Sequence, residues 1–272
     1  MPEVDLTAGT LDYEDTGGDG PIIVLLHGLL MDGAQWRHVV TDLRADFRCV
    51  MPTLPMGAHR RPMRPGADLS LRGLGRIVAE FLTQLDLRDV TLLGESMGAV
   101  LALTAAADLP ERVRRVLAMN AYDYAGGIAR SSLLARLIVT GVLAPGVGRM
   151  FARLEPKPIM RAVLSGGVVD TTALRADYVD ELLEVGRRPG YPSVARAVYS
   201  NLPSLVAARS RYPDVKAPVQ LIYGEKDWSR PSDRQANRHL LPAAEFTEVR
   251  GAGHFIALER PDVPAELLNS AA

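Results

Sequence analysis

A serine flanked by glycines is the first feature of this sequence that could carry chemistry. The pattern GESMG at residues 94–98 follows an apolar run at 90–93 and precedes strong helix formers at 99–107. Small residues on both sides allow a sharp turn between a strand and a helix, which leaves the serine hydroxyl projecting above the sheet. The context predicts that Ser96 is a nucleophile. The alternative is a serine that only caps the helix.

A serine hydroxyl is a weak nucleophile until a neighbouring base accepts its proton, and histidine is the usual base near neutral pH. Only His254 lies in a glycine-rich turn, at 251–254, after a strand-like run at 246–249 and near the C-terminus. This position predicts a histidine on a loop at a sheet edge, free to reach Ser96. The remaining histidines, which need no catalytic explanation, are His27, His38, His59 and His239.

The base needs an acceptor for its second ring N–H, which holds the tautomer and stabilises the imidazolium that forms. Asp227 follows an apolar run at 219–223, so it lies on a strand-end loop beside the one that carries His254. Asp123, which follows the run at 113–119, is the rival for this role. Asp227 is favoured because its strand-end loop is the neighbour of the one that carries His254.

Short apolar runs that end at Gly, Pro, Asn or a charged residue supply the strands that must position these side chains. Most are separated by helical patterns, of which residues 71–85 and 99–107 are the clearest. This alternation predicts an α/β fold with a mainly parallel, doubly wound sheet of about eight strands. The pattern of residues 4–15 predicts an antiparallel hairpin at the edge of the sheet. The predicted inner strands are residues 22–26, 48–51, 90–93, 113–119 and 219–223.

The alternation stops between residues 124 and 212, where helical patterns follow one another without strands. We therefore expect an α/β core of residues 1–123 and 213–272, with a helical cap inserted over the carboxyl edge of the sheet. The cap carries apolar side chains that could line a pocket. They are Leu133, Leu134, Leu137, Ile138, Val142, Met150, Phe151 and Met160.

The amino-acid composition restricts the classes of molecule that this protein is expected to bind. The chain has 31 basic and 32 acidic residues, interspersed, for a formal net charge of -1, so neither a nucleic acid nor a membrane surface is expected to bind it. The first ten residues lack a basic and apolar leader, and no run reaches the roughly 18 apolar residues of a membrane span, which predicts a cytoplasmic protein. Cys49 lies in an apolar run and is expected to be a buried thiol. The sequence leaves open whether the chain forms a homodimer.

Four motifs together resemble the signature set of the α/β-hydrolase superfamily. They are LLHG at 25–28, GESMG at 94–98, GEKD at 224–227 and GH at 253–254, and the resemblance covers about residues 21–123 and 218 to the end. It implies a triad of Ser96, His254 and Asp227. It also implies an oxyanion hole made by the backbone N–H groups of Leu29 and Met97. The residues that the resemblance places around the substrate are His27, Gly28, Met31 and Phe255.

The resemblance implies two-step acyl transfer on a small or medium carboxylic ester, with no metal and no organic cofactor. Other reactions on the same triad stay open, namely carbon–carbon bond hydrolysis, perhydrolysis and acyl transfer. A ligand-binding receptor of the same fold stays open too. Haloalkane dehalogenases and epoxide hydrolases use an aspartate where Ser96 stands, so these two activities are disfavoured.

Three side chains near the motifs are left without a firm role. Glu95, beside the nucleophile, is either a solvated residue of the turn or a polar contact beneath the cap. Trp36 and Trp228 are expected to be packing residues rather than substrate platforms.

Overall fold

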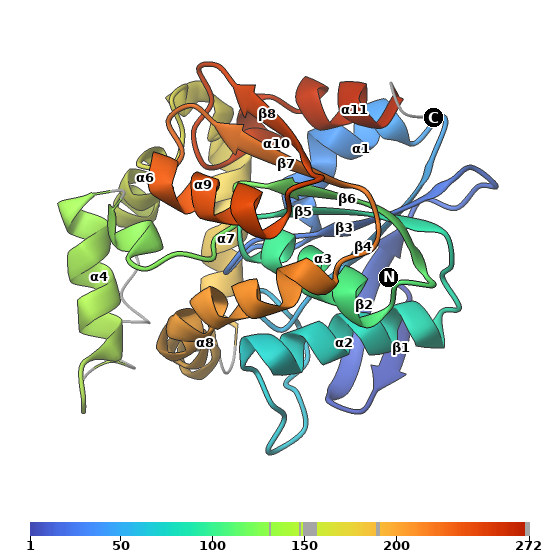
Figure 1. Cartoon of the computed structure of the whole chain (residues 1–272). Coiled ribbons are helices and arrows are strands. Elements are labelled where there is room, and N and C mark those ends of the chain that lie inside the picture. The colour runs from blue at the N-terminus through green and yellow to red at the C-terminus, as the bar shows by residue number, and fades with distance from the viewer. Residues whose placement is uncertain (131, 147, 149–156, 189–190, 270–272) are drawn as a thin grey trace.

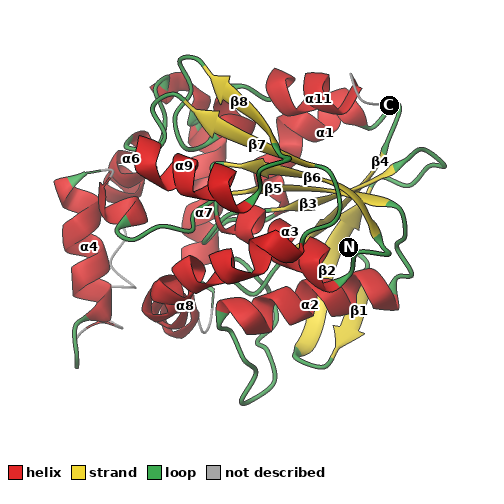
Figure 2. Ribbon diagram, in the orientation of Figure 1, coloured by secondary structure: helices red, strands yellow, loops and turns green. Residues whose placement is uncertain are grey.

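The computed structural model describes residues 1–130, 132–146, 148, 157–188 and 191–269 (Figure 1). These residues form one sheet of eight strands in the order β1-β2-β4-β3-β5-β6-β7-β8, with helices on both faces (Figure 2). β1 pairs with β2 and β2 pairs with β4 in antiparallel fashion, whereas the remaining pairs are parallel. The predicted fold class and the edge hairpin are thereby confirmed. The strands are β1 (Glu3–Leu6), β2 (Gly9–Asp15), β3 (Ile22–Leu26), β4 (Arg48–Pro52), β5 (Val90–Glu95), β6 (Val113–Met119), β7 (Val219–Gly224) and β8 (Glu245–Val249).

Apolar side chains of the inner strands alternate between two cores because successive residues of a strand face opposite sides of a sheet. In β3, Val24 and Leu26 pack with α2 and α3, whereas Ile23 and Leu25 pack with α1 and α11. Burial on both faces explains why these strands read as continuous apolar runs. The helices of the two layers are α1 (Arg37–Leu43), α2 (Leu71–Gln84), α3 (Met97–Asp108), α9 (Pro231–Leu240), α10 (Ile256–Glu259) and α11 (Asp262–Asn269).

The segment between β6 and β7 is helical, and its described residues contain no strand. Its helices gather at one end of the sheet, on the left of Figure 1. α4 packs on α8 and on α6, and α6 packs on α7. The elements are η2 (Gly127–Arg130), α4 (Leu133–Leu143), α6 (Lys157–Ser165), η3 (Thr171–Ala173), α7 (Ala176–Gly186), α8 (Tyr191–Ala207) and η4 (Ala208–Asp214).

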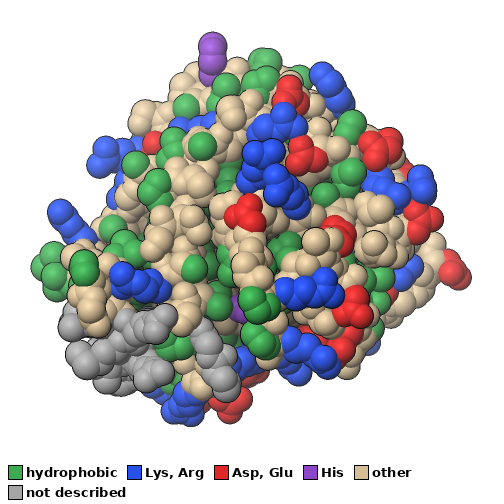
Figure 3. Space-filling view, turned by 90° about the horizontal axis from the view of Figure 1, so that it is seen from below, with side chains coloured by type: hydrophobic (Ala, Val, Ile, Leu, Met, Phe, Trp, Pro, Cys, Tyr) green, Lys and Arg blue, Asp and Glu red, His purple; other side chains and the backbone are tan. Residues whose placement is uncertain are grey.

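The surface mixes charges of both signs, as the balanced composition leads one to expect. On the face that Figure 3 presents, basic and acidic side chains lie side by side. Cys49 is buried, as predicted, and burial raises the pKa of its thiol to about 11. Among the described residues, no helix is both long and apolar enough to cross a membrane.

Candidate active site

Ser96 occupies a strained turn between β5 and α3. Its backbone has φ 60° and ψ −120°, a conformation that L-residues rarely adopt and that costs about 1–3 kcal/mol. Gly94 and Gly98 make the turn sterically feasible. A β-carbon on Gly98 would lie 1.9 Å from the carbonyl oxygen of Leu26, and one on Gly94 would lie 2.3 Å from the carbonyl oxygen of Gly98. The chain therefore turns at once into α3 and projects the hydroxyl of Ser96 over the sheet edge.

Three side chains that lie far apart in the sequence form a continuous hydrogen-bonded chain at this edge. Nε2 of His254 is 2.9 Å from Oγ of Ser96, and Nδ1 of His254 is 2.5 Å from Oδ1 of Asp227. All three are buried. The arrangement allows His254 to take the serine proton while Asp227 holds the imidazole.

The environment of Asp227 keeps this carboxyl ionised. Burial opposes the charge, but the imidazole of His254 and two hydrogen bonds from Ser229 outweigh burial and leave the pKa below its ordinary value. The backbone N–H of Ser229 donates to Oδ2 at 2.9 Å, and its hydroxyl donates to the same oxygen. An anionic Asp227 stabilises an imidazolium.

Asp123, the rival acid, faces a different set of partners. Its carboxylate accepts hydrogen bonds from Tyr212 Oη at 2.7 Å, Asn237 Nδ2 at 2.8 Å and Arg209 at 3.0 Å. Burial raises its pKa, although these partners oppose the rise. The structure thus brings Asp227, and not Asp123, to His254.

Asn120, which the sequence did not single out, braces the histidine loop from the end of β6. Its Nδ2 donates to the carbonyl oxygens of Gly253 and His254 at 3.0 and 2.8 Å, and its Oδ1 accepts the N–H of Gly224 at 2.9 Å. A polar residue directly after a buried strand was the available signal. Asn120 therefore fixes the loop of His254 to the strand that leads to Asp227.

His27 supports the loop after β3. Its Nε2 accepts the N–H of Leu54 at 2.8 Å, so the ring proton is on Nδ1 and donates to the carbonyl oxygen of Gly28 at 2.8 Å. Burial lowers the pKa of His27, which keeps the ring neutral. His27 is fully buried behind the loop, and the cavity beside Ser96 is lined by Gly28, Met31 and Phe255 instead.

The two predicted oxyanion donors lie close to Ser96 in the structure. Leu29 lines the cavity next to Ser96, on the loop that follows β3. Met97 is the first residue of α3, so its backbone N–H has no acceptor within the helix. Both positions are compatible with a backbone pair that receives a developing oxyanion.

Glu95 is buried rather than solvated, and its hydrogen-bond partners Gln35 and Ala257 belong to the core and not to the helical insertion. It is fully buried, and Oε1 accepts the N–H of Ala257 at 3.0 Å while Oε2 accepts a hydrogen bond from Gln35. Gln35 in turn accepts the N–H of Gly28 at 2.9 Å. Burial, opposed by these hydrogen bonds, raises the pKa of Glu95 to about 8.

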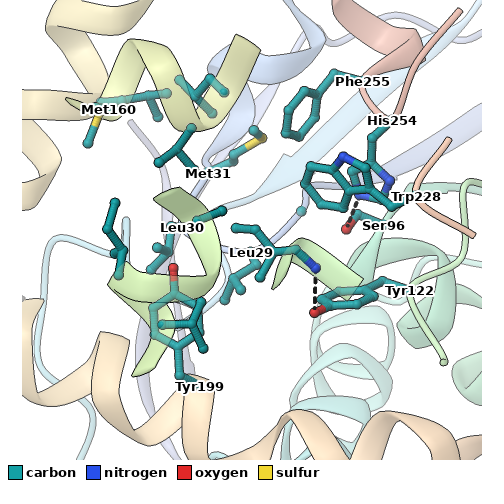
Figure 4. Close-up of a pocket in the computed structure, with 18 of the residues that line it drawn as sticks. Leu29, Leu30, Met31, Ser96, Tyr122, Met160, Tyr199, Trp228, His254 and Phe255 are labelled. Carbon is teal, nitrogen blue, oxygen red and sulfur yellow. Dashed lines mark hydrogen bonds between the residues drawn. The ribbon is translucent and has the colours of Figure 1, made fainter. Parts of the chain in front are cut away.

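A cavity of about 80 Å³ opens beside Ser96 and His254 (Figure 4). Among the described residues that line it there is no Asp, Glu, Lys or Arg. Of the pocket candidates, Ile138 and Met160 line it, whereas Leu133 and Leu137 are exposed, and Met150 and Phe151 lie outside the described residues. The other lining residues include Tyr122, Ile128, Ala135, Val139, Val163, Leu164, Leu182, Tyr191, Tyr199 and Trp228.

Trp228 lies against the imidazole of His254, as Figure 4 shows. The two rings are parallel, 11° apart, with centroids 3.8 Å from each other. Its position directly after Asp227 was the only signal in the sequence. Trp228 was expected to be a packing residue, and the structure shows that it packs on the predicted base and also lines the cavity.

The raised pKa of Glu95 predicts a pH dependence of stability. Between its ordinary value of 4.5 and about 8, the folded protein keeps a proton that the unfolded chain releases, so the contribution of Glu95 to stability falls as pH rises through this interval. Glu95→Gln removes the titration. The melting temperature of the variant relative to the parent is expected to rise by about 5 °C from pH 4.5 to pH 8 and then level off. A difference that is constant with pH would contradict the assignment.

Known proteins share this architecture. A model of the alpha/beta hydrolase fold family matches residues 21–261. Haloalkane dehalogenase 2 of Mycobacterium tuberculosis is 25% identical over 271 residues, which cover 95% of this chain and 90% of that protein. The magnesium-chelatase 30 kDa subunit of Rhodobacter capsulatus is 28% identical over 249 residues, covering 89% and 84%.

A solved structure agrees with the family match. The crystal structure of Cfl2 from Burkholderia cenocepacia superposes with a TM-score of 0.83 at 21% identity, over 98% of this chain and 94% of that one. This likeness concerns the fold, whereas the family match covers the strands and loops that carry Ser96, Asp227 and His254. The chain belongs to the α/β-hydrolase fold family.

Proposed function

We propose that this protein hydrolyses small to medium, uncharged carboxylic esters through an acyl-enzyme on Ser96. The observation that carries the proposal is the hydrogen-bonded chain from Asp227 through His254 to Ser96, which ends in a hydroxyl at the wall of an apolar cavity. A serine so placed is a nucleophile with its base and orienting acid in contact.

The reaction has two halves. Oγ of Ser96 attacks the ester carbonyl carbon while Nε2 of His254 takes the hydroxyl proton, and the oxyanion lies between the backbone N–H groups of Leu29 and Met97. Collapse of the tetrahedral intermediate breaks the bond to the alcohol, which leaves with the proton from His254. Water then attacks the acyl-enzyme while His254 takes one of its protons. Collapse of the second intermediate breaks the bond between the acyl carbon and Oγ, Oγ takes the proton back from His254, and the carboxylic acid is released.

The cavity wall supports the choice of substrate class. The described lining residues offer aliphatic, thioether and aromatic side chains and no fixed charge, so a substrate carboxylate would lose its hydration without gaining an ion pair. About 80 Å³ is room for a few heavy atoms. These two properties favour short, uncharged acyl groups.

Haloalkane dehalogenases are among the relatives, but the nucleophile here does not suit that reaction. Displacement of a halide by Ser96 would form an alkyl ether. Water cannot cleave this ether at a carbonyl carbon, because it has none, so the enzyme would be blocked after one turnover. An acyl ester on the same serine can be hydrolysed.

We further propose that residues 124–212 act as the cap of residues 1–123 and 213–272. Ile138 and Val139 of α4, Met160 of α6 and Leu182 of α7 supply one side of the cavity, while Ser96 and His254 supply the other. In such an arrangement the inserted helices select the acyl group and the core performs the chemistry.

Replacing the nucleophile is the direct test of the proposal. Ser96→Ala removes the covalent route and is expected to lower kcat on a short nitrophenyl ester by at least about 10⁴-fold with the fold intact by circular dichroism. The variant should also lose labelling by a fluorophosphonate. Turnover close to that of the parent protein would refute the proposal.

The two aspartates should behave differently when each is replaced. Asp227→Asn favours the wrong tautomer of His254 and is expected to lower kcat by about 10³ to 10⁴. Asp123→Asn leaves Arg209 without its buried partner, so it should lower the melting temperature while kcat of the folded protein changes less than about threefold. The reverse ranking in kcat would assign the acid role to Asp123.

The cap should set the preferred acyl chain. Each methylene buried in the cavity gains about 0.8 kcal/mol, roughly fourfold in kcat/KM, until the cavity is full. Ile138→Ala enlarges the cavity and should move the optimum to a longer acyl chain in a nitrophenyl ester series. Leu137→Ala, on the same helix but 61% exposed, is the matched control and should leave the optimum in place. An unchanged optimum in Ile138→Ala would remove α4 from the specificity pocket.

A further inference from the structure

A short segment of the helical insertion lies directly on the loop of the predicted base. Residues 166–170, called the strap below, connect α6 with η3. The carbonyl oxygen of Gly167 accepts the backbone N–H of His254 at 2.6 Å and that of Phe255 at 3.2 Å. The strap therefore holds the backbone of the residue that has to transfer protons.

Trp228 joins the strap to the imidazole ring. Its Nε1–H donates to the carbonyl oxygen of Gly166 at 2.8 Å, and its ring stacks on His254. The ring of Phe255 is nearly perpendicular to both, with its centroid 5.2 Å from that of His254 and 5.7 Å from that of Trp228. One face of the imidazole is thus fixed by a side chain that is itself hydrogen bonded to the insertion.

Glu259 ties the strap to the other side of the same loop. Its Oε1 accepts the N–H groups of Val169 and Asp170 at 2.6 and 2.8 Å, and its Oε2 accepts the N–H of Gly253 at 2.6 Å. A single carboxylate therefore links two residues of the strap with the residue that precedes His254.

Two glycines allow the backbones to approach this closely. A β-carbon on Gly253 would lie 2.5 Å from the carbonyl oxygen of Gly167. One on Gly167 would lie 2.4 Å from the ring of Phe255 and 2.9 Å from that of Trp228. The strap thus fits against the loop without intervening side chains.

Such a fit matters because His254 must present Nε2 to the serine and later to the leaving alcohol. A misplacement of about 1 Å in a reacting group can cost about 10²-fold in rate. The imidazolium that forms during each half-reaction would also lie over the face of Trp228, a favourable arrangement for a cation. Both effects act on the transition state more than on the bound substrate.

We infer that the strap, with Trp228 and Glu259, is a positioning device through which the helical insertion sets the orientation of His254. This inference rests on the proposed function and deepens it. The insertion contributes to the rate through the base as well as to selectivity through the cavity. Glu259 is a positioning residue, since it is absent from the cavity wall formed by the described residues.

Glu259→Ala is the central test because it releases three N–H groups without altering the cavity wall. Its kcat on a short nitrophenyl ester is expected to fall about tenfold or more, while KM changes less than twofold. Glu259→Gln keeps the size and part of the acceptor capacity, so it should recover activity in part and carries the test if the alanine variant does not fold. Glu225→Ala is the matched control. It removes the acceptor of Gly251 N–H in the neighbouring turn, away from the strap, and should leave kcat within twofold.

Trp228 is tested by two substitutions. Trp228→Phe keeps an aromatic face but loses the donor to Gly166, and kcat should fall several-fold. Trp228→Leu loses both features, and kcat should fall about 10- to 100-fold. Trp36→Phe, a fully buried tryptophan of the core, controls for the loss of aromatic volume and should affect the melting temperature more than kcat.

Ser96→Ala is assayed alongside with the same substrate. If it is inactive and folded Glu259→Ala turns over at the rate of the parent protein, the positioning role is overturned and the proposed function stands. A fall in kcat matched by an equal rise in KM also overturns that role, because it would indicate a changed pocket. If Ser96→Ala is active, the proposed function fails and the inference fails with it.

Discussion

Gly98 passes so close to the carbonyl oxygen of Leu26 that no side chain could stand between them. This contact presses the first turn of α3 against β3 and obliges the chain to turn within one residue after β5. Ser96 consequently takes the strained conformation at φ 60°. The two apolar cores on either side of the sheet stabilise the layers that impose this strain. The loops bearing His254 and Asp227 can meet Ser96 only because the parallel strands end at the same edge.

The pKa values of two buried carboxyl groups near Ser96 are shifted in opposite directions because their partners differ. Asp227 faces an imidazole and two donors from Ser229, so its pKa is lowered and it is anionic at neutral pH. Glu95 faces the amide groups of Gln35 and Ala257, and its pKa rises to about 8. The first group can stabilise charge that forms on His254. The second joins the turn at Ser96 to α10 and, through Gln35, to the loop at Gly28. Asp227 and Glu95 are both carboxyl groups, so the difference between their pKa values comes from their surroundings.

The sequence predicted the strands and the order of the chemical groups because both depend on local patterns. An apolar run buried on two faces and a glycine on each side of Ser96 are visible without knowledge of the rest of the chain. The partners of Asp123 were not visible, since Arg209, Tyr212 and Asn237 come from segments more than eighty residues away.

The cavity wall was predicted only in part for the same reason. An apolar pattern on α4 does not reveal which side of the helix faces inward. The sequence therefore named both Ile138 and Leu137 as pocket candidates, whereas in the structure Ile138 lines the cavity and Leu137 is exposed. The contact of the strap with His254 runs between backbones, which side-chain types do not encode. Likewise, the position of Trp228 directly after Asp227 does not by itself predict that its ring stacks on the imidazole of His254.

The acyl-enzyme itself provides the most direct test of the account. A short nitrophenyl ester is mixed with the protein, the reaction is quenched within milliseconds, and the release of nitrophenol is compared with the intact mass of the protein. We expect a burst of up to one nitrophenol per molecule, a mass increase equal to the acyl group, and a modified peptide that carries the acyl group on Ser96. Steady turnover with no acylated protein at any quench time, or acyl label on another residue, would contradict it.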